Sequence, residues 1–238
     1  MRVSLRAALT LLSLFLCTYL ASGQEKAGYA GHWEGVVKAP SQEIKFSIDV
    51  AKNEKGAWVG SIAMASSKGI QLSDIVVKGD SVTFKIPVSG GPVFEGKLSE
   101  DEKTITGTLT QGGETVPFEL KKAGEAKVEL PPKSSQIAED FVGNWEGTLQ
   151  TPGSSLRLVL KLSKAADGTA AGVLDSLDQN ASIPIDVINQ EGSSLNFEIR
   201  LVDGTFAGRL NEAKTELSGE WSQGGMKLPL TLKKSQQK

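Results

Sequence analysis

The chain has 238 residues, of which 39% are hydrophobic and 23% charged, a composition typical of a soluble globular protein. Its formal net charge of -2 lacks the basic excess that binding to nucleic acid or to an anionic membrane surface needs. The single cysteine and single histidine exclude an intrachain disulfide and a multi-histidine zinc site.

The first 23 residues predict export. Two arginines precede an apolar run at 7–20, and small residues at 21–23 suit a signal peptidase. We expect cleavage after Gly23, a secreted or periplasmic protein, and no transmembrane span in the mature form. A retained anchor is the alternative, but the run is shorter than the roughly 20 residues that cross a bilayer. Lipidation at Cys17 is disfavoured because Leu16, which is not small, precedes it.

A motif that recurs after 112 residues shows that the chain is a tandem duplication. Gly-His-Trp-Glu-Gly at 31–35 is followed by Gly-Asn-Trp-Glu-Gly at 143–147. The predicted organisation is a signal peptide at 1–23, a first repeat at 28–122, a linker at 123–140 and a second repeat at 141–235. The linker mixes charged residues with a double proline, so we expect a semi-stiff connection rather than a disordered tether.

Each repeat contains eight short runs of alternating apolar residues between turn residues, which is the pattern of β-strands. The runs of the first repeat lie at 33–37, 44–50, 58–64, 70–77, 82–86, 94–98, 105–109 and 116–120. Those of the second lie at 145–149, 156–162, 172–174, 183–185, 195–199, 206–210, 217–221 and 228–232. Alternation in the fourth run of the first repeat shifts between Leu72 and Ile75, which predicts a β-bulge.

Four runs of the first repeat place a glycine two residues after a bulky apolar residue and two before an aliphatic one. These glycines are Gly35, Gly60, Gly96 and Gly107. The two-residue period of a strand turns each of them inward, where glycine weakens a flat sheet but permits strong coiling. We therefore predict an all-β fold of two tandem antiparallel barrels of about eight strands, up-and-down as in lipocalins and avidin, rather than open sandwiches.

Two exchanges between the repeats concern tryptophan. Trp58 is replaced by Ala170, and Leu109 is replaced by Trp221. Opposite changes of size on the same inward face indicate compensating repacking. The tryptophans are therefore expected in the core rather than as exposed platforms for sugars.

The second repeat carries a resemblance. Its segments Gly-Asn-Trp-Glu-Gly-Thr-Leu at 143–149, Leu-Asp-Ser-Leu-Asp-Gln at 174–179 and Gly-Glu-Trp-Ser-Gln-Gly-Gly-Met-Lys-Leu-Pro-Leu at 219–230 resemble a small all-β module. That module precedes the catalytic domain in some secreted bacterial α/β-hydrolases and related serine hydrolases. The resemblance covers most of 141–234 and, more loosely, 29–122. It implies an exported bacterial accessory module without catalytic residues, and nothing in the chain matches the hydrolase domain.

The remaining residues offer little catalytic chemistry. No nucleophile elbow and no phosphate-binding loop occurs. His32 becomes Asn144 in the second repeat and is expected to be a solvated surface residue. Glu34 and Glu146 recur, but they point outward from different repeats, whereas glycoside hydrolysis needs two carboxylates roughly 5 to 10 Å apart. We therefore expect no catalytic residues, no metal site, no cofactor and no enzymatic activity.

One set of polar residues suggests a binding site. In an up-and-down barrel the loops after the first, third, fifth and seventh strands meet at one end, the usual place for a ligand. In the second repeat these loops carry Asp178, Gln179, Asn180, Asp203 and Gln223. The alternative interpretation is that these are ordinary turn residues.

The sequence thus favours an exported, non-catalytic pair of β-barrels that is a binding or accessory module. Its expected partner is a small apolar ligand, a glycan or an envelope protein, depending on whether the barrels are filled or hollow. The alternatives are an extracellular hydrolase-associated protein, a weak hydrolase that uses Asp178 and Asp203, and a structural spacer in the envelope.

Overall fold

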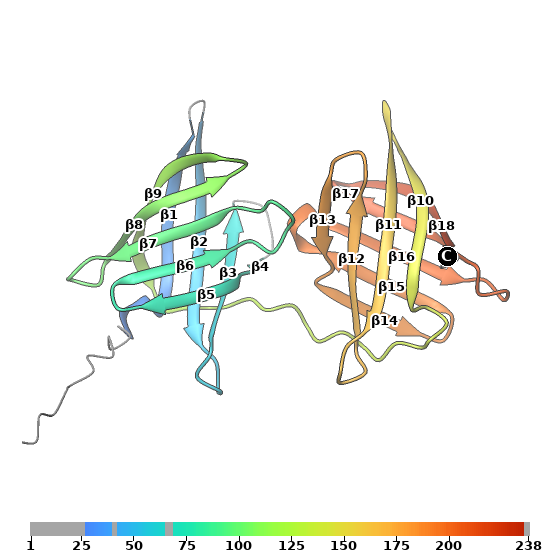
Figure 1. The fold of residues 1–238 in the computed structure, drawn as a ribbon, viewed down its shortest axis with the longest axis horizontal. Coiled ribbons are helices and arrows are strands. Elements are labelled where there is room, and N and C mark those ends of the chain that lie inside the picture. Colours follow the sequence, from blue (N-terminus) through green and yellow to red (C-terminus); the bar gives the residue numbers. More distant parts are fainter. Residues whose placement is uncertain (1–26, 40–41, 65–68, 236–238) are drawn as a thin grey trace, which may run out of the picture.

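The computed structural model describes residues 27–39, 42–64 and 69–235. These residues form two all-β barrels joined by an extended segment (Figure 1). Within the described ranges, no helix has the length and apolar character needed to cross a membrane. The predicted signal peptide at 1–23 lies outside them.

The first barrel is a nine-stranded antiparallel sheet preceded by a short 3-10 turn, η1 (Ala27–Tyr29). Its strands are β1 (Gly31–Ala39), β2 (Gln42–Lys52), β3 (Trp58–Met64), β4 (Ile70–Gln71), β5 (Ser73–Lys78), β6 (Ser81–Lys85), β7 (Val93–Leu98), β8 (Thr104–Gln111) and β9 (Glu114–Gly124). β1 pairs with β2 and β9, and the strand order is β4-β3-β2-β1-β9-β8-β7-β6-β5.

The second barrel repeats this arrangement. Its strands are β10 (Gly143–Thr151), β11 (Ser154–Lys164), β12 (Ala170–Ser176), β13 (Ala181–Pro184), β14 (Val187–Glu191), β15 (Ser194–Ile199), β16 (Gly204–Leu210), β17 (Glu216–Gln223) and β18 (Met226–Lys234). A 3-10 turn, η2 (Arg200–Val202), links β15 to β16. The order is β13-β12-β11-β10-β18-β17-β16-β15-β14. The prediction of two tandem antiparallel barrels is confirmed.

A kinked strand brings the two edges of each sheet together. The fourth predicted run of the first repeat divides into β4 and β5, where Asp74 has φ 50° and the pairing register shifts. In the second repeat the N–H of Ile185 donates to Gly172 O on one edge (3.0 Å), and the N–H of Asp186 donates to Glu198 O on the other (3.0 Å). Eight predicted runs therefore become nine strands, and the predicted bulge is confirmed. Figure 1 shows β1–β3 upright with β5–β7 running across them.

The inward glycines lie where neighbouring strands approach too closely for any side chain. Gly96 and Gly107 are directly paired, and a Cβ on Gly107 would overlap Glu95 O and lie 2.7 Å from Gly96 Cα. The equivalent Gly219 would overlap Ala207 O in the same way. A side chain at these positions is therefore excluded by the backbone of the neighbouring strand.

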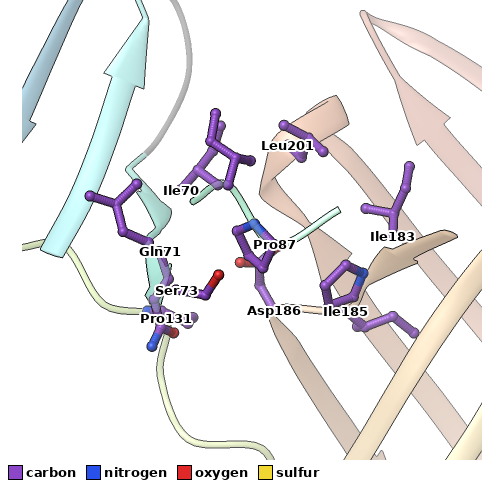
Figure 2. Close-up of a pocket in the computed structure, with 12 residues that line it drawn as sticks. Ile70, Gln71, Ser73, Pro87, Pro131, Ile183, Ile185, Asp186 and Leu201 are labelled. Atoms are coloured by element: carbon purple, nitrogen blue, oxygen red, sulfur yellow. The ribbon is translucent and has the colours of Figure 1, made fainter. Parts of the chain in front are cut away.

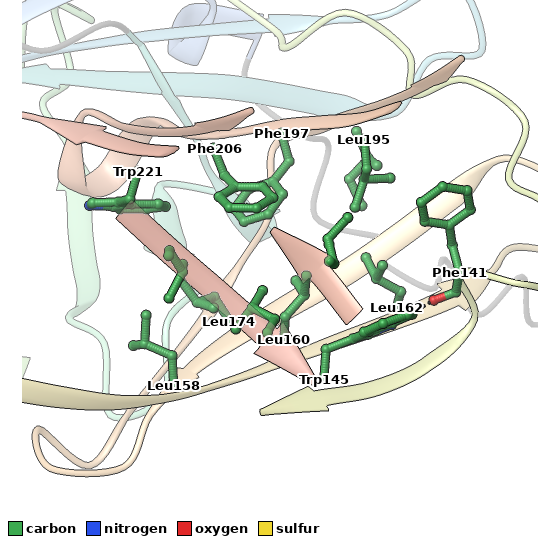
Figure 3. Packing of buried hydrophobic residues seen from close by; sticks show 14 of the residues in the cluster. Phe141, Trp145, Leu158, Leu160, Leu162, Leu174, Leu195, Phe197, Phe206 and Trp221 are labelled. Carbon is green, nitrogen blue, oxygen red and sulfur yellow. Dashed lines mark hydrogen bonds between the residues drawn. The ribbon is translucent and has the colours of Figure 1, made fainter. Parts of the chain in front are cut away.

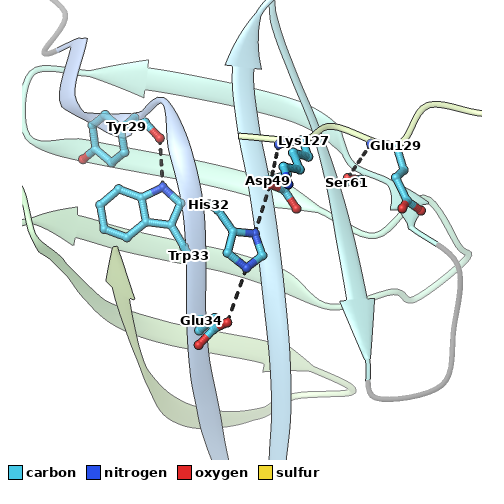
Figure 4. A network of polar contacts seen from close by, with 8 residues as sticks. All are labelled: Tyr29, His32, Trp33, Glu34, Asp49, Ser61, Lys127 and Glu129. Carbon is cyan, nitrogen blue, oxygen red and sulfur yellow. Dashed lines mark hydrogen bonds and ion pairs between the residues drawn. The ribbon is translucent and has the colours of Figure 1, made fainter. Parts of the chain in front are cut away.

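A buried tryptophan closes the same end of each barrel. Trp33 is fully buried and its indole N–H donates to Tyr29 O (3.0 Å; Figure 4). Trp145 makes the equivalent bond to Phe141 O (2.8 Å). Trp221 is also buried, whereas Trp58 is half-buried. The tryptophans belong to the cores, as the sequence predicts.

The Tyr29→Phe variant tests how much the hydroxyl group at this closed end contributes to the stability of the first barrel. Tyr29 Oη donates to Asp80 O and accepts the N–H of Leu98 (3.3 Å), and burial raises the pKa of Tyr29 to about 12. The variant should cost about 1 kcal/mol at pH 7, the usual contribution of one hydrogen bond, because Phe141 fills this place in the second barrel without a hydroxyl.

The pH dependence follows from the raised pKa. The stabilisation by the Tyr29 hydroxyl is fully present below the unfolded-state pKa of about 10 and is lost as the pH rises towards the folded-state value. Urea denaturation should therefore show the stability advantage of wild type over Tyr29→Phe shrinking above pH 10 and reversing before pH 12. A difference that stayed constant over this range would contradict the assignment.

The first half of the linker is bound to the first barrel. The N–H of Lys127 donates to Asp49 Oδ1 (2.7 Å), which also lies 3.0 Å from His32 Nδ1 (Figure 4). The N–H of Glu129 donates to Ser61 Oγ (3.1 Å). The expectation of a solvated His32 is wrong, because its side chain is only 29% exposed and contacts the carboxylate that holds the linker.

The second half of the linker joins the second barrel before residue 141. The N–H of Ser135 donates to Ile188 O (2.9 Å), and the N–H of Ala170 donates to Ser135 O (2.8 Å). Ser135 thus bonds to both β14 and the start of β12, and Ile137 is buried in the second core. Hydrogen bonds to both barrels hold the linker in place.

Candidate functional site

A cavity of about 530 Å³ lies at one end of the first barrel, opposite Trp33. We call it the apolar mouth. It is lined by Val37, Ile44, Phe46, Ile62, Met64, Ile86, Val88, Pro92, Phe94, Leu109, Gln111, Glu114, Val116 and Leu201. Its size falls in the range of roughly 300 to 1,000 Å³ that is usual for small-molecule sites.

The lining of the apolar mouth is almost entirely hydrocarbon. Ile44 and Met64 are 36% and 37% exposed, although both lie on the inward face of their strands. Gln111 and Glu114, at the β8–β9 hairpin, are the polar residues of the described lining. Such a surface attracts an apolar molecule by the hydrophobic effect, at roughly 25 cal/mol per Å² of apolar surface buried.

A buried tryptophan occupies the corresponding end of the second barrel. Trp221 occupies the position equivalent to Leu109, is 3% exposed, and lies tilted against Phe197 with ring centroids 6.2 Å apart (Figure 3). A Cβ on Gly204 would overlap its ring, so glycine makes room for the indole. Leu109 is smaller and only partly buried, and it leaves the equivalent volume of the first barrel unoccupied by side chains.

The second barrel also contributes a wall to the apolar mouth. Leu201, in η2, lines the mouth and packs against the cores of both barrels. Arg200 Nη1 donates to Gly69 O (2.9 Å) and to Glu129 O (3.3 Å), and the N–H of Ser89 donates to Ser182 O (3.1 Å). These bonds fix the second barrel against the first.

A smaller crevice of about 270 Å³ lies between the barrels (Figure 2). It is lined by Ile70, Gln71, Leu72, Ser73, Ile86, Pro87, Pro131, Ile183, Pro184, Ile185, Asp186 and Leu201. Burial raises the pKa of Asp186, although its Oδ2 accepts the N–H of Arg200 (2.7 Å). Ile86 and Leu201 line both this crevice and the apolar mouth.

The five residues predicted to ring the second barrel separate into two groups. Asp178, Gln179 and Asn180 belong to the β12–β13 turn, whereas Asp203 lies in the β15–β16 connection beside the end of β17, where Gln223 is located.

Asp178 is bound to Arg157. Its Oδ1 accepts from Arg157 Nη2 (2.7 Å) and Nε (2.9 Å), and its Oδ2 accepts the backbone N–H of Arg157 (2.7 Å). These bonds hold the pKa of Asp178 below its usual range. A carboxylate held in its charged form is poorly suited to general acid catalysis.

Of the other four residues, one makes hydrogen bonds within the protein, two adopt turn conformations and one is exposed to solvent. Gln223 Oε1 accepts the indole N–H of Trp221 (3.1 Å), and its Nε2 donates to Val202 O (2.9 Å). Asn180 and Asp203 adopt left-handed conformations (φ 49° and 48°), which Asn and Asp tolerate in turns, and Gln179 is exposed. Ligand binding by these five residues stays a prediction. The sequence did not predict a site among the apolar residues of the first barrel. The replacement of Leu109 by Trp221 in the second repeat nevertheless indicated that the interiors of the two barrels differ.

The other candidate carboxylates of the sequence lie apart from one another. Among the residues that the structure describes, no three His, Cys, Asp or Glu side chains are grouped so that they could hold a metal ion. Glu34 and Glu146 are both exposed and lie on separate barrels. Glu146 Oε1 accepts from Ser235 Oγ (2.6 Å).

Comparison with known proteins adds little to this geometry. No family model and no curated protein matches the chain. A candidate outer membrane protein from Bacteroides fragilis is 13% identical with a TM-score of 0.27, and a DUF3598-family protein of unknown function from Nostoc punctiforme is 11% identical with a TM-score of 0.28. Each match covers 87% of this chain and 97% of the other.

These likenesses carry no argument about function at such TM-scores. The predicted resemblance to the β-module of secreted hydrolases stays a prediction. The fold and the apolar mouth define the class of this protein, which is a tandem β-barrel protein with a cavity at one end of its first barrel.

Proposed function

We propose that this is an exported, non-catalytic binding protein that takes one small apolar molecule into its first barrel. The observation that supports the proposal is the contrast between equivalent positions of the two barrels, Leu109 beside a cavity and Trp221 filling one. Export rests on the predicted signal sequence at residues 1–23.

The lining favours an apolar molecule over a glycan. Sugars are bound by convergent hydrogen-bonding groups and exposed aromatic faces. The described lining offers Gln111 and Glu114 as its polar side chains, while Phe46 and Phe94 belong to the buried core. The second barrel then serves as support: it is filled, it positions Leu201, and it holds the linker.

A titration with a neutral environment-sensitive dye, N-phenyl-1-naphthylamine, tests the proposal. We expect the mature protein to enhance its fluorescence saturably with one site per chain, because only the first barrel carries the apolar mouth. Native mass spectrometry of the purified protein should count the same single site. Fluorescence that rises linearly without saturation, or two equal sites per chain, would argue against the proposal.

A further inference from the structure

We infer that Leu201 sets the length of the apolar chain that the first barrel accepts. The inference rests on the proposed function and deepens it. It assigns to a residue of the second barrel the role of a partition, on the side of the site that faces the second barrel, for a site that lies mainly in the first barrel.

The two cavities share two lining residues, one from each barrel. The apolar mouth, of about 530 Å³, and the crevice, of about 270 Å³, have both Ile86 and Leu201 in their linings. Ile86 comes from the first barrel and Leu201 from the second, and Leu201 packs against both cores. In Figure 2, Leu201 lies on the second-barrel side of the crevice, facing Ile70 and Pro87 of the first.

Beyond this partition the crevice is mainly apolar. Leu72, Pro87, Pro131, Ile183 and Ile185 line it, together with the polar side chains of Gln71, Ser73 and Asp186. An alkyl chain that entered through the mouth and passed Leu201 would therefore continue to bury methylene groups. With Leu201 in place, further methylenes would instead stay outside in water.

The partition is held rigidly. The backbone N–H of Arg200 donates to Asp186 Oδ2 (2.7 Å), and its Nη1 donates to Gly69 O of the first barrel (2.9 Å). Asp203, in a left-handed conformation, ends the turn on the other side of Leu201. Because η2 is fixed on both sides, shortening the Leu201 side chain should open a passage without moving the turn.

Displacement of N-phenyl-1-naphthylamine by straight-chain alcohols of increasing length tests the inference. In the wild type we expect affinity to rise about fourfold with each added methylene, because each one buries further apolar surface. The affinity should then reach a plateau, at the chain length beyond which added methylenes stay in water. In Leu201→Ala the plateau should move to chains at least about two methylenes longer, which at that increment means about sixteenfold tighter binding of those chains. Short chains should bind as in the wild type.

Two further variants complete the test. Val202→Ala, in the same turn, removes methyl groups that contact only the second core and should leave the plateau at its wild-type length. Leu201→Phe enlarges the partition and should shorten the plateau, so the inference can be tested even if Leu201→Ala unfolds; a plateau at the wild-type length in this variant would contradict the inference. Thermal melts verify that each variant is folded.

The outcomes separate the two proposals. If the wild type binds the dye and Leu201→Ala keeps the wild-type plateau, the partition role is wrong while the proposed function stands. If Val202→Ala moves the plateau as far as Leu201→Ala, the effect belongs to the turn and not to Leu201. If the wild type fails to bind the dye, both proposals fall.

Discussion

Leu109→Trp should abolish most binding of an apolar probe, raising its dissociation constant about tenfold or more. The substitution reproduces in the first barrel the residue that Trp221 provides in the second, where the indole is 3% exposed and fills the barrel end. A tenfold rise in the dissociation constant corresponds to about 1.4 kcal/mol of binding free energy. The apolar contacts that the indole would take from the ligand contribute more than this. Dye titration of the folded variant measures the change.

The reciprocal variant is the matched control. Trp221→Leu should open the second barrel and raise the stoichiometry from one site to two per chain, at a cost of about 2 to 3 kcal/mol in stability because a buried indole is lost. Gln223, which accepts the indole N–H at 3.1 Å, would lose this partner as well. If Leu109→Trp bound the dye as tightly as the wild type, the ligand could not lie in the apolar mouth.

Gly107→Ala should lower the free energy of unfolding by about 3 kcal/mol or more, a large effect for the addition of one methyl group. The new Cβ would overlap Glu95 O and lie 2.7 Å from Gly96 Cα. Both of these are backbone atoms of the paired strand β7, so no side chain can rotate away to relieve the overlap. Urea denaturation of the variant measures the loss.

A control for this prediction lies at the end of β9. Gly124→Ala adds the same methyl group where no atom lies within 4 Å, so its effect should stay within about 0.5 kcal/mol. Gly219→Ala should repeat the large loss in the second barrel, since its Cβ would overlap Ala207 O. Equal stabilities of Gly107→Ala and Gly124→Ala would show that close strand approach does not require glycine here.

The two repeats have diverged by exchange of a few side chains on one framework. Trp33 and Trp145 close one end of both barrels with the same hydrogen bond to the segment before the first strand. At the other end, Leu109 and Trp221 make one barrel hollow and the other filled. A filled barrel can be a rigid support, and η2 of this support reaches the site of its neighbour.

Several features were predictable because they depend on neighbouring residues in the chain. Alternation with a period of two marks strands, and glycines such as Gly107 mark the points of closest approach. The shift of alternation near Leu72 identified the kink at Asp74, where the strand leaves one edge of the sheet and joins the other.

The path of the linker was less predictable. A double proline and mixed charges indicated a stiff segment, but they did not indicate that Lys127 would bond to Asp49, or that His32 would lie against the same carboxylate. Ser135 likewise bonds to strands far away in the sequence. These contacts depend on which strand surfaces happen to lie next to the linker.

By itself the sequence determined the duplication, the strands and the barrel-like sheets, because these follow from local periodicity and from glycine at fixed points. Only the tertiary structure decided which barrel is hollow. The volume of a cavity depends on the sizes of side chains that meet from several strands, and here also on Leu201 from the other barrel. Polar turn residues such as Asp178 stood out in the sequence, yet folding directs them to partners within the protein, whereas the apolar mouth consists of residues that look like ordinary core.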